Sequence, residues 1–138
     1  MSRKTARVGV IGCGWAGTER HLPSYAACDR ASIAGVYDRN LDKAQEAAAE
    51  YEKVTVHNSL ESLLNDSLDI VSVTTPPWTH ADIACRALRA GCDVLSEKPM
   101  AMSRAEANQM LDVAHSTGNH FGVVHNFLFT NSVQRVRS

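Results

Sequence analysis

The chain has 138 residues, about the size of one domain, and 44% of them are hydrophobic and 21% charged, an ordinary globular composition. Its formal net charge is −1 and it contains no basic run, which argues against binding to nucleic acid or to an anionic membrane surface. No segment is apolar over the ~20 residues that a membrane span requires, and no signal-peptide pattern is present.

The cysteines and histidines do not cluster. No two of the four cysteines form a C-x-x-C pair, and the six histidines are scattered along the chain. A structural metal site needs closer Cys and His spacing, so we expect no bound metal. Isolated cysteines are typical of small buried residues in a reduced compartment, and we expect a cytoplasmic protein. The cysteines are Cys13, Cys28, Cys85 and Cys92.

The first predicted strand, Ala6–Ile11, leads directly into a glycine-rich turn. Gly12, Gly14 and Gly17 have the spacing G-x-G-x-x-G, in which each glycine has its own physical reason. The first permits a tight turn, the second leaves room for a pyrophosphate, and the third lets the next helix approach the strand. That helix would point its N–H groups and the positive end of its dipole at the phosphates. The motif by itself is weak, because glycine-rich turns are common.

The next elements follow the same order of helix and strand. Pro23 falls inside the helix expected at 18–28, so it either kinks that helix or opens its second segment as a first-turn residue. The second strand is expected over Ala31–Tyr37, ending at Asp38. Asn40 is a suitable cap for the following helix, whose alanines form one apolar face.

The rest of the chain continues this alternation. Further strands are expected at 53–57, 68–74, 92–95 and 121–124, and further helices at 59–65, 79–90 and 103–118. Thr79 with Asp82, and Ser103 with Glu106, each form a predicted capping box. Six strands alternating with helices predict an α/β fold with a doubly wound, parallel six-stranded sheet, the Rossmann fold. The expected strand order is 3-2-1-4-5-6, with a binding crevice at the carboxyl ends of the first and fourth strands.

An acid lies near one side of this predicted crevice. Asp38 closes the second strand 26 positions after Gly12, near the place where an acid accepts the ribose hydroxyls of a dinucleotide. A carboxylate there repels a 2′-phosphate and favours NAD over NADP, although the neighbouring Arg39 can hold a phosphate. The alternative interpretation of Asp38 is a solvated turn residue.

Three motifs occur together and in a fixed order. They are the glycine turn at 12–17, the segment Thr75-Pro76-Pro77-Trp78-Thr79-His80, and Glu97-Lys98-Pro99. The combination resembles the N-terminal domain of the Gfo/Idh/MocA oxidoreductases, the family of glucose–fructose oxidoreductase and inositol dehydrogenase. The resemblance covers essentially the whole chain. It implies an oxidoreductase that uses NAD, or alternatively NADP, and acts on a hydroxyl of a sugar, cyclitol or related polyol.

The resemblance also implies a role for each motif. The glycine turn would hold the pyrophosphate, Asp38 the adenosine ribose and Glu97 the nicotinamide ribose, while Lys98 would face the reacting carbon. An ammonium beside the substrate oxygen stabilises the negative charge that develops there, so Lys98 is the expected catalytic residue. Cofactor contacts are thereby expected for Gly12, Cys13, Gly14, Trp15, Ala16, Gly17, Asp38, Arg39, Thr75, Pro76, Pro77, His80, Glu97, Lys98 and Asn126.

Several of these residues have other interpretations. His80 lies in the first turn of a helix, where a histidine more often bonds local backbone than takes part in catalysis. Trp15 and Trp78 either shield the cofactor or fill the core between sheet and helices. Lys98 has the alternative of a surface lysine before a loop. Members of the family tend to have the Lys–Pro peptide in the cis form, which predicts a cis bond between Lys98 and Pro99.

The end of the chain suggests a boundary. We expect residues 1–126 to form the dinucleotide-binding domain and residues 127–138 to begin the connection to a second domain. In the family that second domain supplies most substrate contacts, so this chain would bind NAD(H) without turnover by itself. The apolar run 127–129 after Asn126 would drive self-association if exposed, and we expect a homo-oligomer. Residues 131–137 are expected to begin an amphipathic helix.

Two other functions compete with this interpretation. A non-catalytic NAD(P)-binding or redox-sensing module could use the same sheet, but it has no need of the ammonium of Lys98. A methyltransferase could also use it, but Gly17 and the proline-rich turn after the fourth strand count against that function.

Overall fold

A six-stranded parallel sheet with the strand order β3-β2-β1-β4-β5-β6 forms the centre of the molecule. The computed structural model describes residues 4–130 and 134–136. The strands are β1 (Ala6–Ile11), β2 (Ala31–Tyr37), β3 (Thr55–Val56), β4 (Ile70–Val73), β5 (Asp93–Ser96) and β6 (Phe121–Val123). The predicted fold class and strand order are confirmed. The order reverses between β1 and β4, which is where doubly wound sheets bind their ligands.

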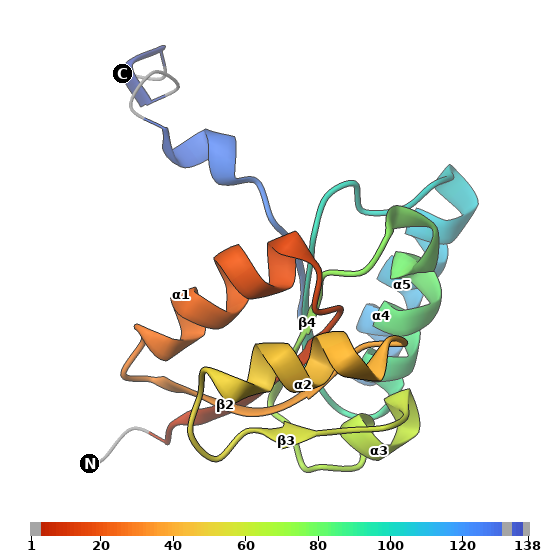
Figure 1. Cartoon of the computed structure of the whole chain (residues 1–138). Helices are drawn as coiled ribbons and strands as arrows, with labels where there is room; N and C mark the ends of the chain where they lie inside the picture. Colours follow the sequence, from red (N-terminus) through yellow and green to blue (C-terminus); the bar gives the residue numbers. More distant parts are fainter. Residues whose placement is uncertain (1–3, 131–133, 137–138) are drawn as a thin grey trace.

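Helices cover both faces of this sheet (Figure 1). A π-helical turn η1 (Gly17–His21), α1 (Leu22–Ala26) and α2 (Leu41–Ala49) lie on one side, and α3 (Leu60–Leu64), α4 (His80–Arg89) and α5 (Arg104–Thr117) lie on the other. Two short 3-10 turns, η2 (Pro77–Thr79) and η3 (Asn126–Phe129), complete the described elements. None of the helices among the described residues is long and apolar enough to cross a bilayer.

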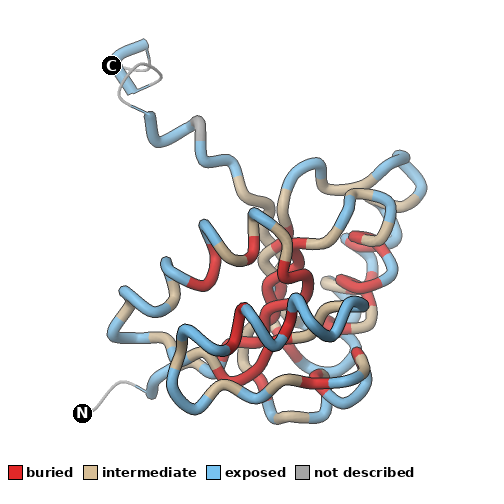
Figure 2. The backbone as a smooth tube through the Cα atoms, in the orientation of Figure 1, coloured by how far each residue is buried: buried red, intermediate tan, exposed pale blue. Residues whose placement is uncertain are grey.

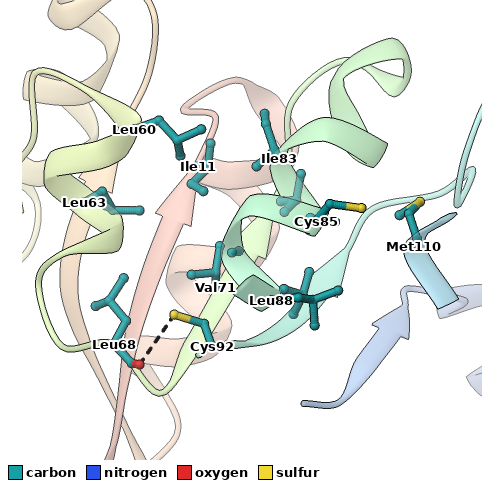
Figure 3. Packing of buried hydrophobic residues seen from close by; sticks show 14 of the residues in the cluster. Ile11, Leu60, Leu63, Leu68, Val71, Ile83, Cys85, Leu88, Cys92 and Met110 are labelled. Carbon is teal, nitrogen blue, oxygen red and sulfur yellow. Dashed lines mark hydrogen bonds between the residues drawn. The ribbon is translucent and has the colours of Figure 1, made fainter. Parts of the chain in front are cut away.

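Each face of the sheet has its own apolar core, seen as the buried centre of Figure 2. Val8 and Val10 of β1 pack toward α1 and α2, whereas Ile11 packs toward α3 and α4. This follows from the alternation of side chains along a strand. Figure 3 shows the larger cluster, in which Leu88 and Met110 are fully buried between sheet and helices. The sheet is therefore held rigidly on both faces, and its carboxyl edge remains for function.

The predicted helix caps are confirmed at two places and wrong at one. The side chain of Asn40 accepts the N–H of Asp42 at 3.1 Å, and Ser103 accepts the N–H of Glu106 at 3.1 Å. Thr79 does not cap α4, because residues 77–79 already form the helical turn η2. Its hydroxyl is instead 2.7 Å from the carbonyl oxygen of Pro76.

Pro23 opens α1 rather than breaking the helix that follows the glycine turn. The helix continues from η1 into α1, and Pro23 lies in the first turn of α1. At the junction the N–H of Leu22 bonds the carbonyl oxygen of Gly17, five residues back, in place of the usual four. Proline has no N–H to contribute, so its place in a first turn costs little. Both His21 and Leu22 are buried against the sheet at this junction.

Two predicted boundaries were too generous. The third strand contains only Thr55 and Val56 instead of 53–57, since Lys53 has a φ of 62°, which is incompatible with extended backbone. The fourth begins at Ile70. Beyond β6, the helix expected over 131–137 falls mainly outside the described residues.

Candidate functional site

The three glycines after β1 have three different surroundings. Gly12 has a φ of +99°, and a Cβ atom there would lie 2.8 Å from the backbone of Thr74. A Cβ on Gly17 would lie 2.2 Å from the carbonyl oxygen of Gly12. A Cβ on Gly14 would meet no protein atom within 4 Å. The first and third glycines are thus required by the protein itself, whereas the space above Gly14 is open.

Thr74 fixes the shape of this turn from the neighbouring strand. Its N–H donates to the carbonyl oxygen of Ile11 at 2.8 Å, and its hydroxyl donates to the carbonyl oxygen of Gly12 at 2.6 Å. Thr74 is buried at the carboxyl end of β4, so the turn after β1 and the end of β4 form one rigid unit. This role of Thr74 is not among the predictions made from the sequence. A threonine directly after a buried apolar strand was the available signal.

Asp38 lies where a ribose-binding acid is expected, and backbone donors hold both of its oxygens. Oδ2 accepts the N–H of Cys13 at 2.8 Å, and Oδ1 accepts the N–H of Asn40 at 2.7 Å. Each carboxylate oxygen has a second lone pair, so two acceptor sites remain for hydroxyl groups. Burial, and secondly the charge of Asp38, raise the pKa of the Cys13 thiol to about 12. Cys13 is therefore a neutral, buried packing residue. Arg39, which follows Asp38 in the sequence, is exposed.

The loop after β4 is tied to the loop after β5 by His80. The residue is fully buried, with Nδ1 2.8 Å from the carbonyl oxygen of Pro99 and Nε2 2.8 Å from that of Thr75. The interpretation of His80 as a residue that bonds local backbone is confirmed. With no exposed surface, His80 can support a cofactor contact only through these two loops. Pro76 is exposed and Pro77 half-buried beside it.

Glu97 and Lys98 follow β5 at the same edge. The Glu97 side chain is mostly buried, at 18% exposed, and its Oε1 lies 3.0 Å from Nε2 of His21. Lys98 is exposed, and its peptide bond to Pro99 is cis, as the resemblance predicts. Asn126 is exposed in η3, just beyond β6.

Both tryptophans lie on the surface, so the interpretation that they fill the core is wrong. Trp15 is 66% exposed and Trp78 71% exposed. The guanidinium carbon of Arg20 lies 5.0 Å from the ring centre of Trp15, within the range of a cation–π interaction. Trp15 and Gly14 line a groove of about 400 Å³ between η1 and α2.

The structure brings most of the expected site residues to one edge of the sheet. The glycine turn follows β1, Asp38 follows β2, Thr75 to Pro77 follow β4, and Glu97 and Lys98 follow β5. Within the part of the chain that the structure describes, no three His, Cys, Asp or Glu side chains are grouped to hold a metal ion. The arrangement is a sheet edge with open space above Gly14, an acid on one side, and an acid and a lysine on the other.

Comparison with known proteins gives matches to an oxidoreductase family and to solved structures that hold NAD or NADP. A family model described as "Oxidoreductase family, NAD-binding Rossmann fold" (Gfo/Idh/MocA) matches residues 6–125. The D-glucoside 3-dehydrogenase of Escherichia coli is 31% identical over 138 residues, which are 99% of this chain and 39% of the relative.

Two solved structures have the same fold with cofactor bound. GenD2 from gentamicin A biosynthesis, in complex with NAD, has a TM-score of 0.90 and 30% identity, covering 96% of this chain and 38% of that one. KijD10, a 3-ketoreductase from Actinomadura kijaniata in complex with NADP and TDP-benzene, has a TM-score of 0.89 and 31% identity. The match covers 96% of this chain and 41% of KijD10. The chain thus spans about two fifths of the length of these relatives.

Proposed function

Because the chain belongs to the Gfo/Idh/MocA family of oxidoreductases with an NAD-binding Rossmann fold, we propose that it is the cofactor-binding part of a sugar dehydrogenase or ketoreductase. The reaction is hydride transfer between a nicotinamide cofactor and a hydroxyl or keto group of a sugar, cyclitol or related polyol. Both the E. coli relative and KijD10 carry position 3 of the sugar in their names, which favours that position here.

The space over Gly14 is the observation that carries the proposal. It is the one turn glycine whose missing side chain leaves room for a ligand rather than for the protein. The helix that follows begins at this turn, and the positive end of its dipole favours a negatively charged pyrophosphate. Asp38 then receives the adenosine ribose, and the dinucleotide extends across the turn toward β4 and β5.

Lys98 is the proposed catalytic residue. Lys98 lies just after β5 and its side chain is exposed. The backbone angles of Lys98 are restricted because it precedes Pro99. When bound, a nicotinamide cofactor supplies or accepts the hydride. The ammonium of Lys98 stabilises negative charge on the substrate oxygen and, in the direction of carbonyl reduction, donates the proton that converts this oxygen to a hydroxyl.

The rival function is a non-catalytic NAD(P)-binding or redox-sensing module, and both functions predict cofactor binding. Calorimetric titration of the 138-residue chain with NAD⁺, NADP⁺ and S-adenosylmethionine tests the shared step. We expect binding of NAD⁺, weaker binding of NADP⁺ and no binding of S-adenosylmethionine. Binding of S-adenosylmethionine alone would point to a methyltransferase and contradict the proposal.

Lys98→Met separates the enzyme from the module. In a protein that carries these residues together with the further length present in the relatives, we expect the variant to retain NAD⁺ affinity and to lose oxidation of sugars and polyols. Loss of NAD⁺ binding as well would assign Lys98 a structural role. By themselves the 138 residues are expected to bind cofactor without turnover, since the named relatives have most of their length outside the matching part.

We further propose a reducing, cytoplasmic location and self-association. The four cysteines are unpaired thiols, which suits a reducing compartment. Leu128 and Phe129 are 43% and 80% exposed next to each other, which favours association with a second copy.

A further inference from the structure

A chain of four polar side chains runs from the interior of the sheet to the crevice, and the proposed function does not account for it. Nε2 of His21 lies 3.0 Å from Oε1 of Glu97, and its Nδ1 lies 2.9 Å from Oγ of Ser72. The hydroxyl of Tyr25 lies 2.8 Å from the same Ser72 oxygen. His21 is 6% exposed and Ser72 is fully buried. Burying the polar side chains of His21 and Ser72 costs free energy unless they are hydrogen-bonded, so their presence in the core calls for a structural or functional reason.

The contacts have one consistent direction. An ionised Glu97 can only accept, so the Nε2 of His21 donates to it. The Nδ1 of the neutral ring then accepts from the hydroxyl of Ser72, whose oxygen in turn accepts from Tyr25. Burial raises the pKa of the Tyr25 phenol, which keeps that donor protonated at neutral pH. Ser72 and Tyr25 thus fix the ring tautomer that presents an N–H to Glu97.

Glu97 is held at both oxygens but is not saturated. Oε1 faces His21, and Oε2 lies 3.2 Å from the backbone N–H of Lys98. A glutamate side chain otherwise loses considerable rotamer freedom when it binds a ligand. Here that freedom is already removed, while one lone pair on each oxygen remains for a pair of vicinal hydroxyls.

The topology places this carboxylate at the nicotinamide half of a bound dinucleotide. Asp38 at the end of β2 takes the adenosine side, and the open space at Gly14 takes the pyrophosphate, so the other half extends toward β4 and β5. Glu97 directly follows β5. His21 reaches it from the π-helical turn of the helix that begins at the pyrophosphate turn.

We propose that His21 is a positioning residue that fixes the carboxylate of Glu97 for the ribose hydroxyls on the nicotinamide side of the cofactor. Ser72 and Tyr25 set the orientation and tautomer of its ring. The inference rests on the proposed function, since it assigns an additional residue to the same cofactor crevice.

Two substitutions of similar size test which nitrogen matters. The amide nitrogen of glutamine occupies about the place of Nε2, whereas that of asparagine corresponds to Nδ1. His21→Gln therefore keeps a donor for Glu97, and His21→Asn loses it. Affinities for NAD⁺ and for ADP, which lacks the nicotinamide half, are measured by calorimetry on the 138-residue chain.

We expect His21→Asn to weaken NAD⁺ binding about tenfold and ADP binding by less than about twofold. His21→Gln should recover most of the NAD⁺ affinity. In a Glu97→Ala background, which leaves no acceptor for the ring, His21→Asn should have no further effect on NAD⁺ affinity, because the residue acts through Glu97.

The chain offers a matched control. His57, which follows β3, is 7% exposed, with Nδ1 2.8 Å from Oγ of Ser62 and Nε2 3.3 Å from Oδ2 of Asp66. Its ring thus has the same kinds of partner as that of His21, a serine hydroxyl and a carboxylate. His57→Asn should lower stability as His21→Asn does and leave the ratio of NAD⁺ to ADP affinity unchanged.

Equal losses of NAD⁺ and ADP affinity in His21→Asn, or equal behaviour of the Asn and Gln variants, would overturn the inference. If His21→Asn does not fold, Ser72→Ala serves in its place, and an unchanged affinity ratio there would overturn it too. Failure of the unsubstituted chain to bind either nucleotide would refute the proposed function itself, and the role of His21 with it.

Discussion

At the scale of single residues, two glycines of the turn are required for the fold, and the third is free of contacts within the protein. Gly12 and Gly17 are restricted by backbone atoms of the protein, whereas Gly14 faces open space. One methyl group added at different glycines therefore has different consequences. The same division holds at Asp38, whose carboxylate both braces the turn and presents acceptors to a ligand.

Gly17→Ala should lower the stability of the chain, whereas Gly14→Ala should lower its affinity for NAD⁺. Gly17→Ala places a Cβ 2.2 Å from a carbonyl oxygen and should lower the free energy of unfolding by roughly 3 kcal/mol. Gly14→Ala should change it by less than about 0.5 kcal/mol, while NAD⁺ affinity falls at least about tenfold as the methyl group occupies the pyrophosphate space. Urea unfolding and calorimetry check the pair. Normal NAD⁺ binding by Gly14→Ala would remove the observation on which the proposed function depends.

Asp38→Asn should shift the cofactor preference toward NADP⁺. The amide oxygen keeps one of the two backbone hydrogen bonds that Asp38 accepts from Cys13 and Asn40, and the charge that repels a 2′-phosphate is removed. Arg39 is adjacent to receive that phosphate. We expect the ratio of NADP⁺ to NAD⁺ affinity to rise about tenfold, measured by calorimetry. Asp42→Asn, an exposed acid in the first turn of α2, is the control and should leave the ratio unchanged. The same ratio in both variants would mean that Asp38 does not face the adenosine ribose.

At the scale of elements, the ends of helices decide how loops of the crevice are placed. α5 begins with a capping serine, so the chain after Pro99 enters it at a defined angle. The helix after the glycine turn has no side-chain cap at η1, and the N–H of Thr18 near its start bonds the carbonyl oxygen of Gly14 at 3.0 Å. At the π-helical junction, both His21 and Leu22 reach the sheet.

Ser103→Ala should destabilise the chain by about 1 kcal/mol, because the N–H of Glu106 loses its partner. Ser24→Ala is the matched control, since the hydroxyl of Ser24 bonds the carbonyl oxygen of Arg20 within a helix. Such a bond adds little, and alanine has the better helix propensity, so we expect a change of about zero. Both are measured by urea unfolding. Equal losses in the two variants would show that the cap of α5 is not what Ser103 contributes.

At the scale of the whole molecule, burial controls how stability depends on alkaline pH. The pKa values of the Cys85, Cys92 and Tyr25 side chains are raised, first by burial, and that of Cys13 is raised to about 12. Each group binds its proton more tightly when folded than when unfolded. The stabilisation is complete below the ordinary pKa of a thiol, 9.0, and is lost as the pH rises toward 12.

We therefore expect the free energy of unfolding to fall between pH 9 and pH 12, and to fall less steeply in Cys13→Ala. Urea unfolding at a series of pH values measures both slopes. Labelling with a thiol reagent at pH 8 is an independent check, in which the half-buried Cys28 reacts and Cys13 does not. Identical slopes, together with rapid labelling of Cys13, would contradict its burial as a neutral thiol.

The alternation of strands and helices, the strand order, the glycine turn and the caps at Asn40 and Ser103 could all be predicted from the sequence. These features depend on local signals, namely hydrophobic periodicity, glycine spacing and the residues at helix starts. The cap assigned to Thr79 was wrong, because two adjacent prolines begin a helical turn earlier than the capping pattern indicates.

Only the tertiary structure decided how the polar residues of the crevice support one another. Thr74 bonds the glycine turn from 62 positions away, His80 joins two loops, and His21 meets Glu97 across 76 positions. Hydrogen bonds between buried side chains leave no periodic trace in a sequence, because either partner could pair with any other polar group until the sheet brings them together. The sequence by itself determined that a dinucleotide turn and a Lys-Pro motif lie at one sheet edge. The fold determined that Glu97 is already oriented there.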